Sequence, residues 1–234
     1  QDAREGSCDG EEGRYMVREV RGEKAGVRGD AVAVVVLAAG GSSRLGMPKQ
    51  LVRWRARTLL RRAVETALAG VRQGGTGAGR TARAVTVPLG PVVVVLGAEA
   101  ERLRAGLRGL PVEVVVNAEW ATGVSASVRA GLEAAGEVPG CLFVVADQPF
   151  VTADLLRGML ALFRGGAPIV ACAYAGTLGV PALFDRAYFG ELAGLEGDAG
   201  AKRIIERHRD VVRVVEFERG ATDVDTLGDR ESLY

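Results

Sequence analysis

The residues most suited to chemistry lie in a glycine- and serine-rich stretch, residues 40–49, with the sequence GGSSRLGMPK. It follows an unbroken small or apolar run over residues 31–39, which is typical of a parallel strand covered on both faces. The leading glycines let the backbone approach a ligand closely. Backbone N–H groups with Arg and Lys at the carboxyl end of a strand favour phosphate binding. The candidate phosphate ligands are Gly40, Gly41, Ser42, Ser43, Arg44 and Lys49.

This stretch differs from the two commonest phosphate-binding motifs. Gly41 and Gly46 have the spacing of a P-loop, but Met47 stands where that motif has its lysine, and no Ser or Thr follows Lys49. The dinucleotide pattern G-x-G-x-x-G is also absent from it. We therefore expect phosphate binding by a loop of another type.

Three carboxylates follow apolar runs further along the chain. Asp147 comes directly after residues 141–146, and Asp223 and Asp225 follow residues 211–217. An Asp at the carboxyl end of a strand is expected to face the same crevice as Lys49. Mg²⁺ takes carboxylate oxygens together with phosphate oxygens and water, so Asp147 is a candidate metal ligand. By spacing alone, a turn or a helix N-terminus explains Asp147 equally well, and a solvated turn explains the later pair.

Apolar runs and helical patterns alternate along the chain, and this alternation predicts the elements that position these residues. Thr58 and Thr152 are suited to begin helices as N-caps. Alternating strands and helices predict right-handed βαβ units, hence a three-layer α/β/α Rossmann-like fold with a mainly parallel sheet. The predicted strands are residues 31–39, 92–96, 112–116, 141–146, 169–173 and 211–217, with a short edge strand at 51–54, and the predicted helices are 58–69, 98–107, 125–135, 152–163 and 199–208.

The bulk composition is that of an ordinary globular protein, with 234 residues, 48% apolar and 25% charged. Residues 1–30 carry eight acidic and six basic side chains and are predicted to be a flexible tail or leader, leaving residues 31–234 as a single domain. Residues 71–91 are predicted to be a mobile connection, in which residues 73–91 look like an insertion. The net charge of +1 gives no reason to expect binding to nucleic acid or to an anionic membrane.

The remaining composition indicates neither a membrane protein nor a cysteine-based site. No apolar stretch reaches the length of a membrane span, and a cytoplasmic location is expected. Cys8, Cys141 and Cys172 have no metal-ligand spacing, and the last two are predicted to be reduced core residues. The single histidine, His208, is expected near the C-terminus of a helix, and no Ser/His/Asp or Cys/His set forms around it.

Residues 37–51, LAAGGSSRLGMPKQL, resemble the signature LAAGxSxRMGxPKQLL of the nucleotidyltransferases related to molybdenum cofactor cytidylyl- and guanylyltransferases. The resemblance implies that Arg44, Lys49 and Asp147 are catalytic and that Asp147 and Asp225 hold a Mg²⁺ ion. Asp225 resembles the Asp of a family segment D-I-D-T-P-E-D, although Leu227 and Gly228 replace its Pro and Glu. It also implies nucleotide contacts from Leu37, Ala38, Ala39, Gly40, Gly41, Ser42, Ser43, Arg44 and Lys49.

Two further stretches resemble segments of the same family. Residues 117–127, NAEWATGVSAS, resemble N-x-x-W-x-x-G-M-x-x-S and imply nucleotide contacts from Asn117, Gly123, Ser125 and Ser127. Ser125 is equally suited to be a helix N-cap, and Trp120 is expected to be a packing residue. Residues 197–202 resemble G-D-x-G-A-R and could present amides and Lys202 to an anionic acceptor, although a helix N-cap by Asp198 is an equal alternative.

The resemblance implies a function. Its cytidylyl branch shows Ala-Ala-Gly and Pro-Lys-Gln-Leu, as this chain does, and implies transfer of CMP from CTP, or of another NMP from its NTP, to the phosphate of the molybdopterin cofactor with release of pyrophosphate. One alternative is a guanylyl- or other nucleotidyltransferase acting on a sugar phosphate or phospho-organic acid. Another is a non-catalytic chaperone that delivers the finished cofactor to a molybdenum hydroxylase.

Overall fold

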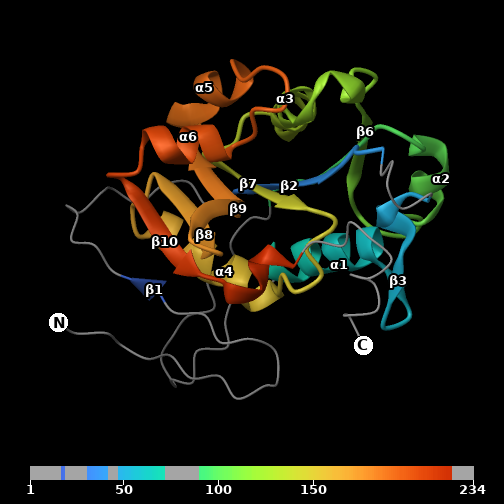
Figure 1. Ribbon diagram of the computed structural model, residues 1–234, viewed down its shortest axis with the longest axis horizontal. Coiled ribbons are helices and arrows are strands. Elements are labelled where there is room, and N and C mark those ends of the chain that lie inside the picture. The colour runs from blue at the N-terminus through green and yellow to red at the C-terminus, as the bar shows by residue number, and fades with distance from the viewer. Residues whose placement is uncertain (1–16, 19–30, 42–46, 72–89, 223–234) are drawn as a thin grey trace.

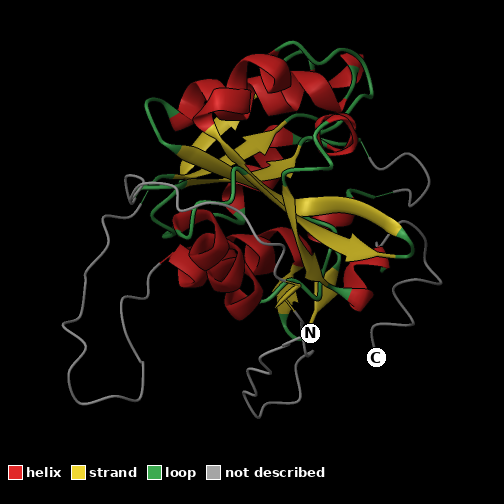
Figure 2. Ribbon diagram, turned by 90° about the vertical axis from the view of Figure 1, so that its left-hand side faces the viewer, coloured by secondary structure: helices red, strands yellow, loops and turns green. Residues whose placement is uncertain are grey.

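The chain folds around one eight-stranded sheet covered by helices on both faces, as Figures 1 and 2 show. The computed structural model describes residues 17–18, 31–41, 47–71 and 90–222, so the predicted tail and the predicted connection lie almost entirely outside the described residues. In Figure 2 the strands run between two layers of helices. The expected three-layer α/β/α arrangement is confirmed.

The sheet has the strand order β1-β10-β8-β9-β7-β2-β5-β6. Strands β7, β2, β5 and β6 are parallel neighbours, and β10 is parallel to β8, whereas β9 runs antiparallel to both β7 and β8 and β1 antiparallel to β10. The sheet is therefore mainly parallel, as predicted. Its strands are β1 (Val17–Arg18), β2 (Ala33–Ala38), β5 (Val92–Leu96), β6 (Glu113–Val116), β7 (Gly140–Val145), β8 (Ile169–Tyr174), β9 (Thr177–Asp185) and β10 (Val212–Glu216).

Burial on both faces explains the unbroken apolar run of β2. Val34 and Val36 contribute to one hydrophobic cluster, and Ala33 and Val35 to the other, because alternate side chains of a strand point to opposite faces. The first cluster is covered by α1 (Leu59–Val71), α2 (Ala100–Ala105) and α4 (Ala153–Arg164), and the second by α3 (Val124–Ala135), α5 (Phe189–Ala193) and α6 (Lys202–Arg207).

Two regions differ from the sequence prediction. Residues 51–54 do not form an edge strand of the sheet: a 3-10 helix η1 (Lys49–Leu51) is followed by a separate hairpin of β3 (Arg53–Trp54) and β4 (Arg57–Thr58). Strand β9 was not predicted, because glycine and Pro181 interrupt its pattern. It enters the sheet between β7 and β8, where long-range pairing overrides its weak local signal.

The two predicted threonine caps are present. The hydroxyl of Thr58 accepts a hydrogen bond from the Arg61 amide, and that of Thr152 accepts one from the Leu155 amide, each at 3.2 Å. These bonds fix where α1 and α4 begin, and α4 follows the loop that carries Asp147. Among the described residues, no helix combines the length and apolarity needed to cross a membrane.

Removing the cap of α4 tests this boundary. Thr152→Ala should lower the free energy of unfolding by about 1 kcal/mol, because the Leu155 amide loses its acceptor. Thr152→Ser keeps a hydroxyl at the same place and should stay within a few tenths of a kcal/mol of the wild type. Urea unfolding followed by circular dichroism measures both, and equal losses in the two variants would show that the hydroxyl does not stabilise the helix.

Candidate functional site

A cleft of about 390 Å³ opens where β2 and β7 end. Its floor comes from the last residues of these two strands and its walls from η1, from a 3-10 helix η2 (Trp120–Thr122), from the first turn of α3 and from the loop before α6. This is the place where an open parallel sheet binds ligands, at the carboxyl edge of its strands. The lining residues are Leu37, Ala38, Ala39, Gly40, Gly41, Lys49, Gln50, Trp120, Ala121, Gly123, Val124, Ser127, Val145, Ala146, Asp147 and Asp198.

An ion pair between Lys49 and Asp147 lies in this cleft. The Lys49 Nζ contacts the Asp147 Oδ2, and the two side chains are only 22% and 16% exposed. The residues lie 98 positions apart in the sequence and meet because β2 and β7 are adjacent parallel strands. The expectation that they share one crevice is therefore confirmed. A cation and a carboxylate so placed can contact, respectively, a phosphate and the metal ion that accompanies it.

Gln50 holds the start of the glycine-rich loop, a role that the sequence analysis did not identify. Its side chain is 3% exposed, and its Nε2 donates to the Ala38 carbonyl at 3.0 Å and to the Gly40 carbonyl at 2.9 Å. Both carbonyls lie at the point where β2 gives way to the loop. The only sign of this role in the sequence was the amide side chain directly after Lys49, in a segment that must be buried.

Trp120 forms a wall of the cleft while packing on glycines. A Cβ at Gly97 would lie 2.5 Å from the Trp120 Cβ, and one at Gly41 would lie 3.0 Å from its ring. The indole is 36% exposed and lines the cleft. The expectation of a packing residue is correct but incomplete, because the ring also presents a surface to whatever the cleft binds.

Asn117 and Ser127 are both buried and form a hydrogen-bonded pair beside the cleft. The Asn117 Nδ2 donates to the Ser127 Oγ at 3.1 Å, while the Asn117 Oδ1 accepts the Glu119 amide at 2.9 Å. Ser127 lines the cleft, and Asn117 does not. Because the Ser127 oxygen accepts from the amide, its own hydrogen is available to donate to a ligand.

Helix α3, which carries Ser125 and Ser127, begins at Val124, one residue earlier than predicted. This start decides whether Ser125 can be the N-cap. The N-cap of α3 is Gly123, so the alternative of Ser125 as N-cap is wrong. Ser125 is 1% exposed, and within the described part of the chain its hydroxyl has no hydrogen-bond partner. It belongs to the first turn of α3 but does not line the cleft.

The loop before α6 is clamped against the start of α3. Gly123 has φ +122°, and a Cβ there would lie 2.2 Å from the backbone of Gly197, whose carbonyl accepts the Ser125 amide at 3.1 Å. This contact brings Asp198 to the cleft. The alternative of Asp198 as a helix cap is wrong, because α6 starts at Lys202 with Ala201 as its N-cap. Lys202 is exposed and lies near Glu206 at 3.9 Å, away from the lining.

Several predicted site residues cannot be placed. Ser42, Ser43, Arg44 and the carboxylates Asp223 and Asp225 lie outside the described residues. Within the described ranges, no group of three or more His, Cys, Asp or Glu side chains could hold a metal ion. Among the described residues, the carboxylates of Asp147 and Asp198 line the cleft, and a metal bound there could also take oxygens of its substrate and water.

The lone histidine and the buried cysteines lie apart from the cleft. His208 is the C-cap of α6, as expected for its position, and its Nε2 lies 2.8 Å from Glu191, whose pKa is lowered mainly by a hydrogen bond from Arg207. Cys141 and Cys172 are free thiols, and burial raises the pKa of each, so they stay protonated as core residues. None of these residues lines the cleft.

Comparisons with known proteins agree with this geometry. The sequence profile of a family described as MobA-like NTP transferase domain matches residues 34–212. Nicotine blue oxidoreductase of Paenarthrobacter nicotinovorans is 31% identical over 214 residues, covering 87% of this chain and 95% of that protein. The structure of an Rv0371c homologue from Mycobacterium sp. strain JC1 is 32% identical, with a TM-score of 0.69, covering 88% of this chain and 96% of that one. Rv0371c of Mycobacterium tuberculosis H37Rv in complex with manganese is 30% identical, with a TM-score of 0.64, covering 87% and 97%.

The role of Gln50 can be tested by stability. Gln50→Glu keeps the shape of the side chain but removes the two N–H donors to Ala38 and Gly40, and it places a carboxylate against their carbonyl oxygens. We expect the free energy of unfolding in urea to fall by about 1–3 kcal/mol. Gln148→Glu removes only one comparable buried bond, to the Gly220 carbonyl, and should cost less. A Gln50→Glu variant as stable as the wild type would contradict the assigned role.

Proposed function

The chain belongs to the family of MobA-like NTP transferase domains, and from this premise we propose that it transfers CMP from CTP to the phosphate of the molybdopterin cofactor, releasing pyrophosphate. The observation that supports a nucleotidyl transfer most directly is the Lys49–Asp147 pair within a cleft lined by the end of β2 and by Gly40 and Gly41, which follow it. The preference for CTP is supported by the residues Ala38, Ala39 and Gly40 and by the Pro-Lys-Gln-Leu segment that follows.

The cleft residues fit the binding of a divalent cation. Asp147 supplies a hard carboxylate oxygen at the edge of the sheet, and Mg²⁺ commonly needs only one or two such protein ligands, with phosphates and water completing its shell. We propose Asp147 and Asp225 as the residues that would hold Mg²⁺. The manganese in the Rv0371c structure supports a divalent ion in a protein 30% identical to this chain. When bound, the ion would neutralise the negative charge of the phosphates.

The described side chains can position the nucleotide. The Lys49 ammonium lies beside Asp147 and can pair with phosphate oxygens while charge grows on the α-phosphate. Arg44 and the amides of residues 40–43 are proposed to hold the β- and γ-phosphates. The Ser127 oxygen already accepts a hydrogen bond from Asn117, so the Ser127 hydroxyl can donate its hydrogen to an acceptor atom of the base.

The proposed reaction then needs little covalent help from the protein. An oxygen of the acceptor phosphate attacks the α-phosphorus in line, the bond from this phosphorus to the β-phosphate oxygen breaks, and pyrophosphate leaves with the electron pair. Positioning and electrostatic stabilisation supply most of the acceleration in such reactions. The absence of a histidine or cysteine from the cleft lining among the described residues is consistent with that chemistry.

One relative favours a second candidate function. The 31% identical protein of Paenarthrobacter nicotinovorans bears the name nicotine blue oxidoreductase. An oxidoreductase activity would use the same cleft for the nucleotide part of a redox cofactor, and the Lys49–Asp147 pair would then serve binding alone. The two functions differ in their products, so a single set of assays separates them.

A substrate panel tests the proposal. Each of CTP, GTP, ATP and UTP would be incubated with the molybdopterin cofactor and Mg²⁺ or Mn²⁺, and pyrophosphate release measured. We expect release with CTP alone. Preference for GTP, or release only with a sugar phosphate or phospho-organic acid as acceptor, would replace the assigned substrates. Tight cofactor binding without pyrophosphate from any NTP would support a chaperone that serves a molybdenum hydroxylase. Oxidation of NADH or NADPH in the presence of nicotine blue would support the oxidoreductase.

Substitution of the ion pair tests its part in turnover. Lys49→Ala and Asp147→Asn should each reduce pyrophosphate release by about 10²–10³-fold, because each removes a charge placed for the transition state. Arg164→Ala and Asp154→Asn likewise remove one positive and one negative charge, but on α4 and away from the cleft lining, and should keep wild-type rates. Rates within threefold of the wild type in either cleft variant (roughly 0.6 kcal/mol) would remove the pair from the mechanism.

A further inference from the structure

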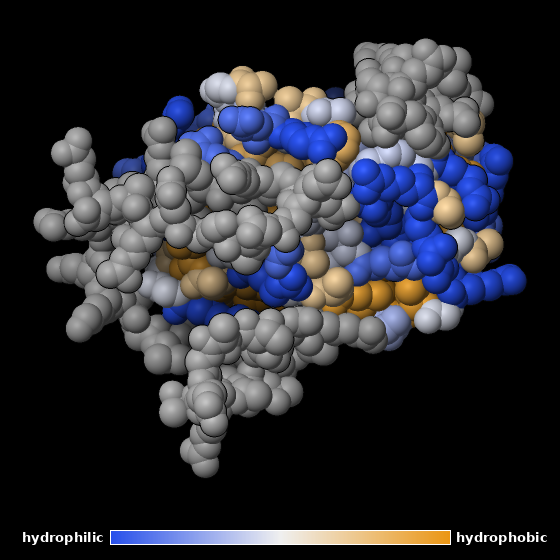
Figure 3. All heavy atoms as spheres, turned by 90° about the horizontal axis from the view of Figure 1, so that it is seen from below, coloured by the Kyte–Doolittle hydropathy of each residue, from blue (hydrophilic) through white to orange (hydrophobic). Residues whose placement is uncertain are grey.

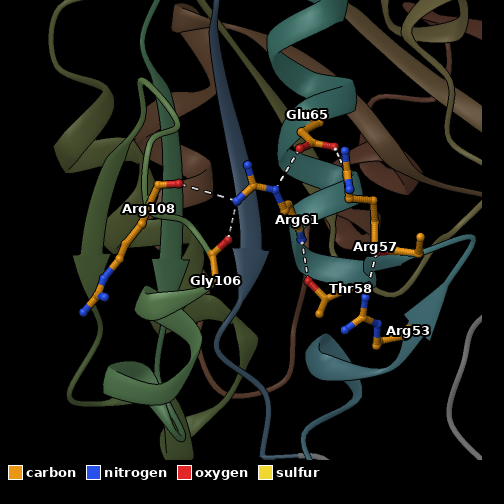
Figure 4. Close-up of polar contacts among 8 residues, drawn as sticks. Arg53, Arg57, Thr58, Arg61, Glu65, Gly106 and Arg108 are labelled. Carbon is orange, nitrogen blue, oxygen red and sulfur yellow. Dashed lines mark hydrogen bonds and ion pairs between the residues drawn. The ribbon is translucent and has the colours of Figure 1, made fainter.

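The arginines at the start of α1 are held by contacts within their own chain. Strongly hydrophilic residues cover the side of the molecule where Figure 1 places α1, α2 and β3, as Figure 3 shows. On this side Arg57 and Arg61 share Glu65, with Nε–oxygen distances of 3.3 and 2.8 Å (Figure 4). The Arg61 Nη1 also donates to the carbonyls of Gly106 at 2.9 Å and Arg108 at 3.5 Å. These contacts join α1 to the loop after α2, so the two arginines serve the fold.

The carboxylate of Asp198 is in a different situation. It is exposed and lines the cleft, and within the described residues no cation or hydrogen-bond donor pairs with it. Two lysines of nearby segments contact other carboxylates: Lys49 pairs with Asp147, and Lys202 lies 3.9 Å from Glu206. A ligand that enters the cleft therefore meets a negative charge that these lysines do not compensate.

The loop that carries Asp198 is fixed to helix α3. The Ser125 amide donates to the Gly197 carbonyl at 3.1 Å, and the Arg129 Nη1 donates to the Leu195 carbonyl at 2.6 Å. Both donors belong to α3, which also lines the cleft with its first turn. The backbone from which the carboxylate projects is thus in place before a ligand arrives, and this lowers the cost of ordering it on binding.

A carboxylate at this place selects the part of a ligand that it can face. Phosphate groups carry negative charge, so at close range they are repelled by Asp198. An ionised carboxylate only accepts hydrogen bonds, and its natural partners are N–H donors and cations. We therefore expect Asp198 to face a hydrogen-bond donor of the ligand, at a distance from the phosphates.

The cleft offers an aromatic wall close to Asp198. Trp120 lies three residues before Gly123, where an added Cβ would lie 2.8 Å from the Asp198 amide nitrogen. The indole is backed by backbone at two glycines, because a Cβ would lie 2.7 Å from the ring at Gly97 and 3.0 Å from it at Gly41. The ring is 36% exposed, and of the described residues that line the cleft Trp120 alone is aromatic. A face held in this way suits a planar heterocycle, since bases stack on aromatic side chains.

The aromatic wall and the ion pair lie over different strands of the sheet. Lys49 and Asp147 meet beyond the ends of β2 and β7, whereas Trp120 packs on Gly41 and Gly97, which follow β2 and β5. In the sheet, β2 lies between β7 and β5. A ligand whose phosphates lie at the ion pair can therefore place a ring against the indole.

We propose that Asp198 is a specificity-determining residue, which accepts hydrogen bonds from the amino group of a heteroaromatic ring packed against Trp120. The Ser127 hydroxyl lines the same cleft and can donate to an acceptor atom of that ring. Cytosine and pterin both carry an exocyclic amino group next to a ring nitrogen, so CTP and the acceptor are the two sources of such a ring. The choice of these two sources rests on the proposed function.

Matched pairs of ligands separate recognition of an amino group from binding of a metal ion. UTP has a carbonyl oxygen where CTP has its amino group, and lumazine has one where pterin has its amino group. If Asp198 reads the amino group, its loss affects only one member of a pair. If Asp198 held a metal ion, the ion would serve the phosphates of every NTP, and CTP and UTP would be weakened alike.

Titration calorimetry with these four ligands and Mg²⁺ tests the proposal. The wild type should bind CTP more tightly than UTP, or pterin more tightly than lumazine, by about tenfold. Asp198→Ala should weaken the amino ligand of that pair by about tenfold without weakening its partner, because a carbonyl oxygen donates no hydrogen bond. Asp198→Asn keeps an acceptor without the charge and should be intermediate. The matched control Glu196→Ala removes an exposed carboxylate of the same loop that does not line the cleft, and it should bind as the wild type does.

Four results would overturn the proposal. They are no binding of any of the four ligands by the wild type, equal affinities within both pairs, an equal loss for both members of a pair in Asp198→Ala, and the same loss in Glu196→Ala. Thermal unfolding checks that each variant is folded, and Asp198→Asn keeps the test valid if Asp198→Ala is not. The pair that discriminates identifies the source of the ring.

These measurements need no turnover, so they separate this inference from the proposed activity. A wild type that discriminates within a pair but releases no pyrophosphate would refute the activity and leave the role of Asp198 standing. A wild type that releases pyrophosphate but does not discriminate within either pair would do the reverse.

Discussion

The ion pair between Lys49 and Asp147 is the interaction on which the rest of the site depends. Each residue stands just beyond the end of a buried parallel strand, and the pairing of β2 with β7 brings them together across 98 positions of sequence. Both side chains are largely buried, and a buried charge is costly in a protein interior unless it is paired. The pair therefore joins the segments that follow β2 and β7 at the edge of the sheet where the cleft opens.

The residues that stabilise the sheet lie within its strands, and the polar residues of the site lie where the strands end. Within the sheet, β2 and β7 are apolar throughout because helices cover both faces, and polar side chains enter only where the strands end. At that edge, side-chain amides hold neighbouring groups in place: Gln50 holds the Ala38 and Gly40 carbonyls, and Asn117 holds Ser127. A rigid edge of this kind keeps donors in place before a ligand arrives, which is what electrostatic catalysis requires.

Charge that is balanced over the whole chain is unevenly distributed in space. The net charge of +1 gave no reason to expect binding to nucleic acid or to an anionic membrane, yet one short stretch concentrates arginines on a hairpin and the adjoining helix. Two of them share Glu65, and two others stack on the buried Trp54. Bulk charge averages over such local asymmetry, so it does not describe the charge of any one part of the surface.

Local patterns were enough to predict the mainly parallel sheet, the threonine caps of α1 and α4 and the presence of Lys49 and Asp147 in one crevice. The patterns are unbroken apolar runs, helical spacing and the rule that parallel strands end at a common edge. The three-dimensional structure was needed to show that β9 enters the sheet, that Gln50 holds the loop, that Trp120 forms a wall of the cleft and that Asp198 reaches it instead of capping α6. Each of these depends on contacts between residues far apart in the chain, and a local pattern carries no information about which distant backbone a side chain will meet.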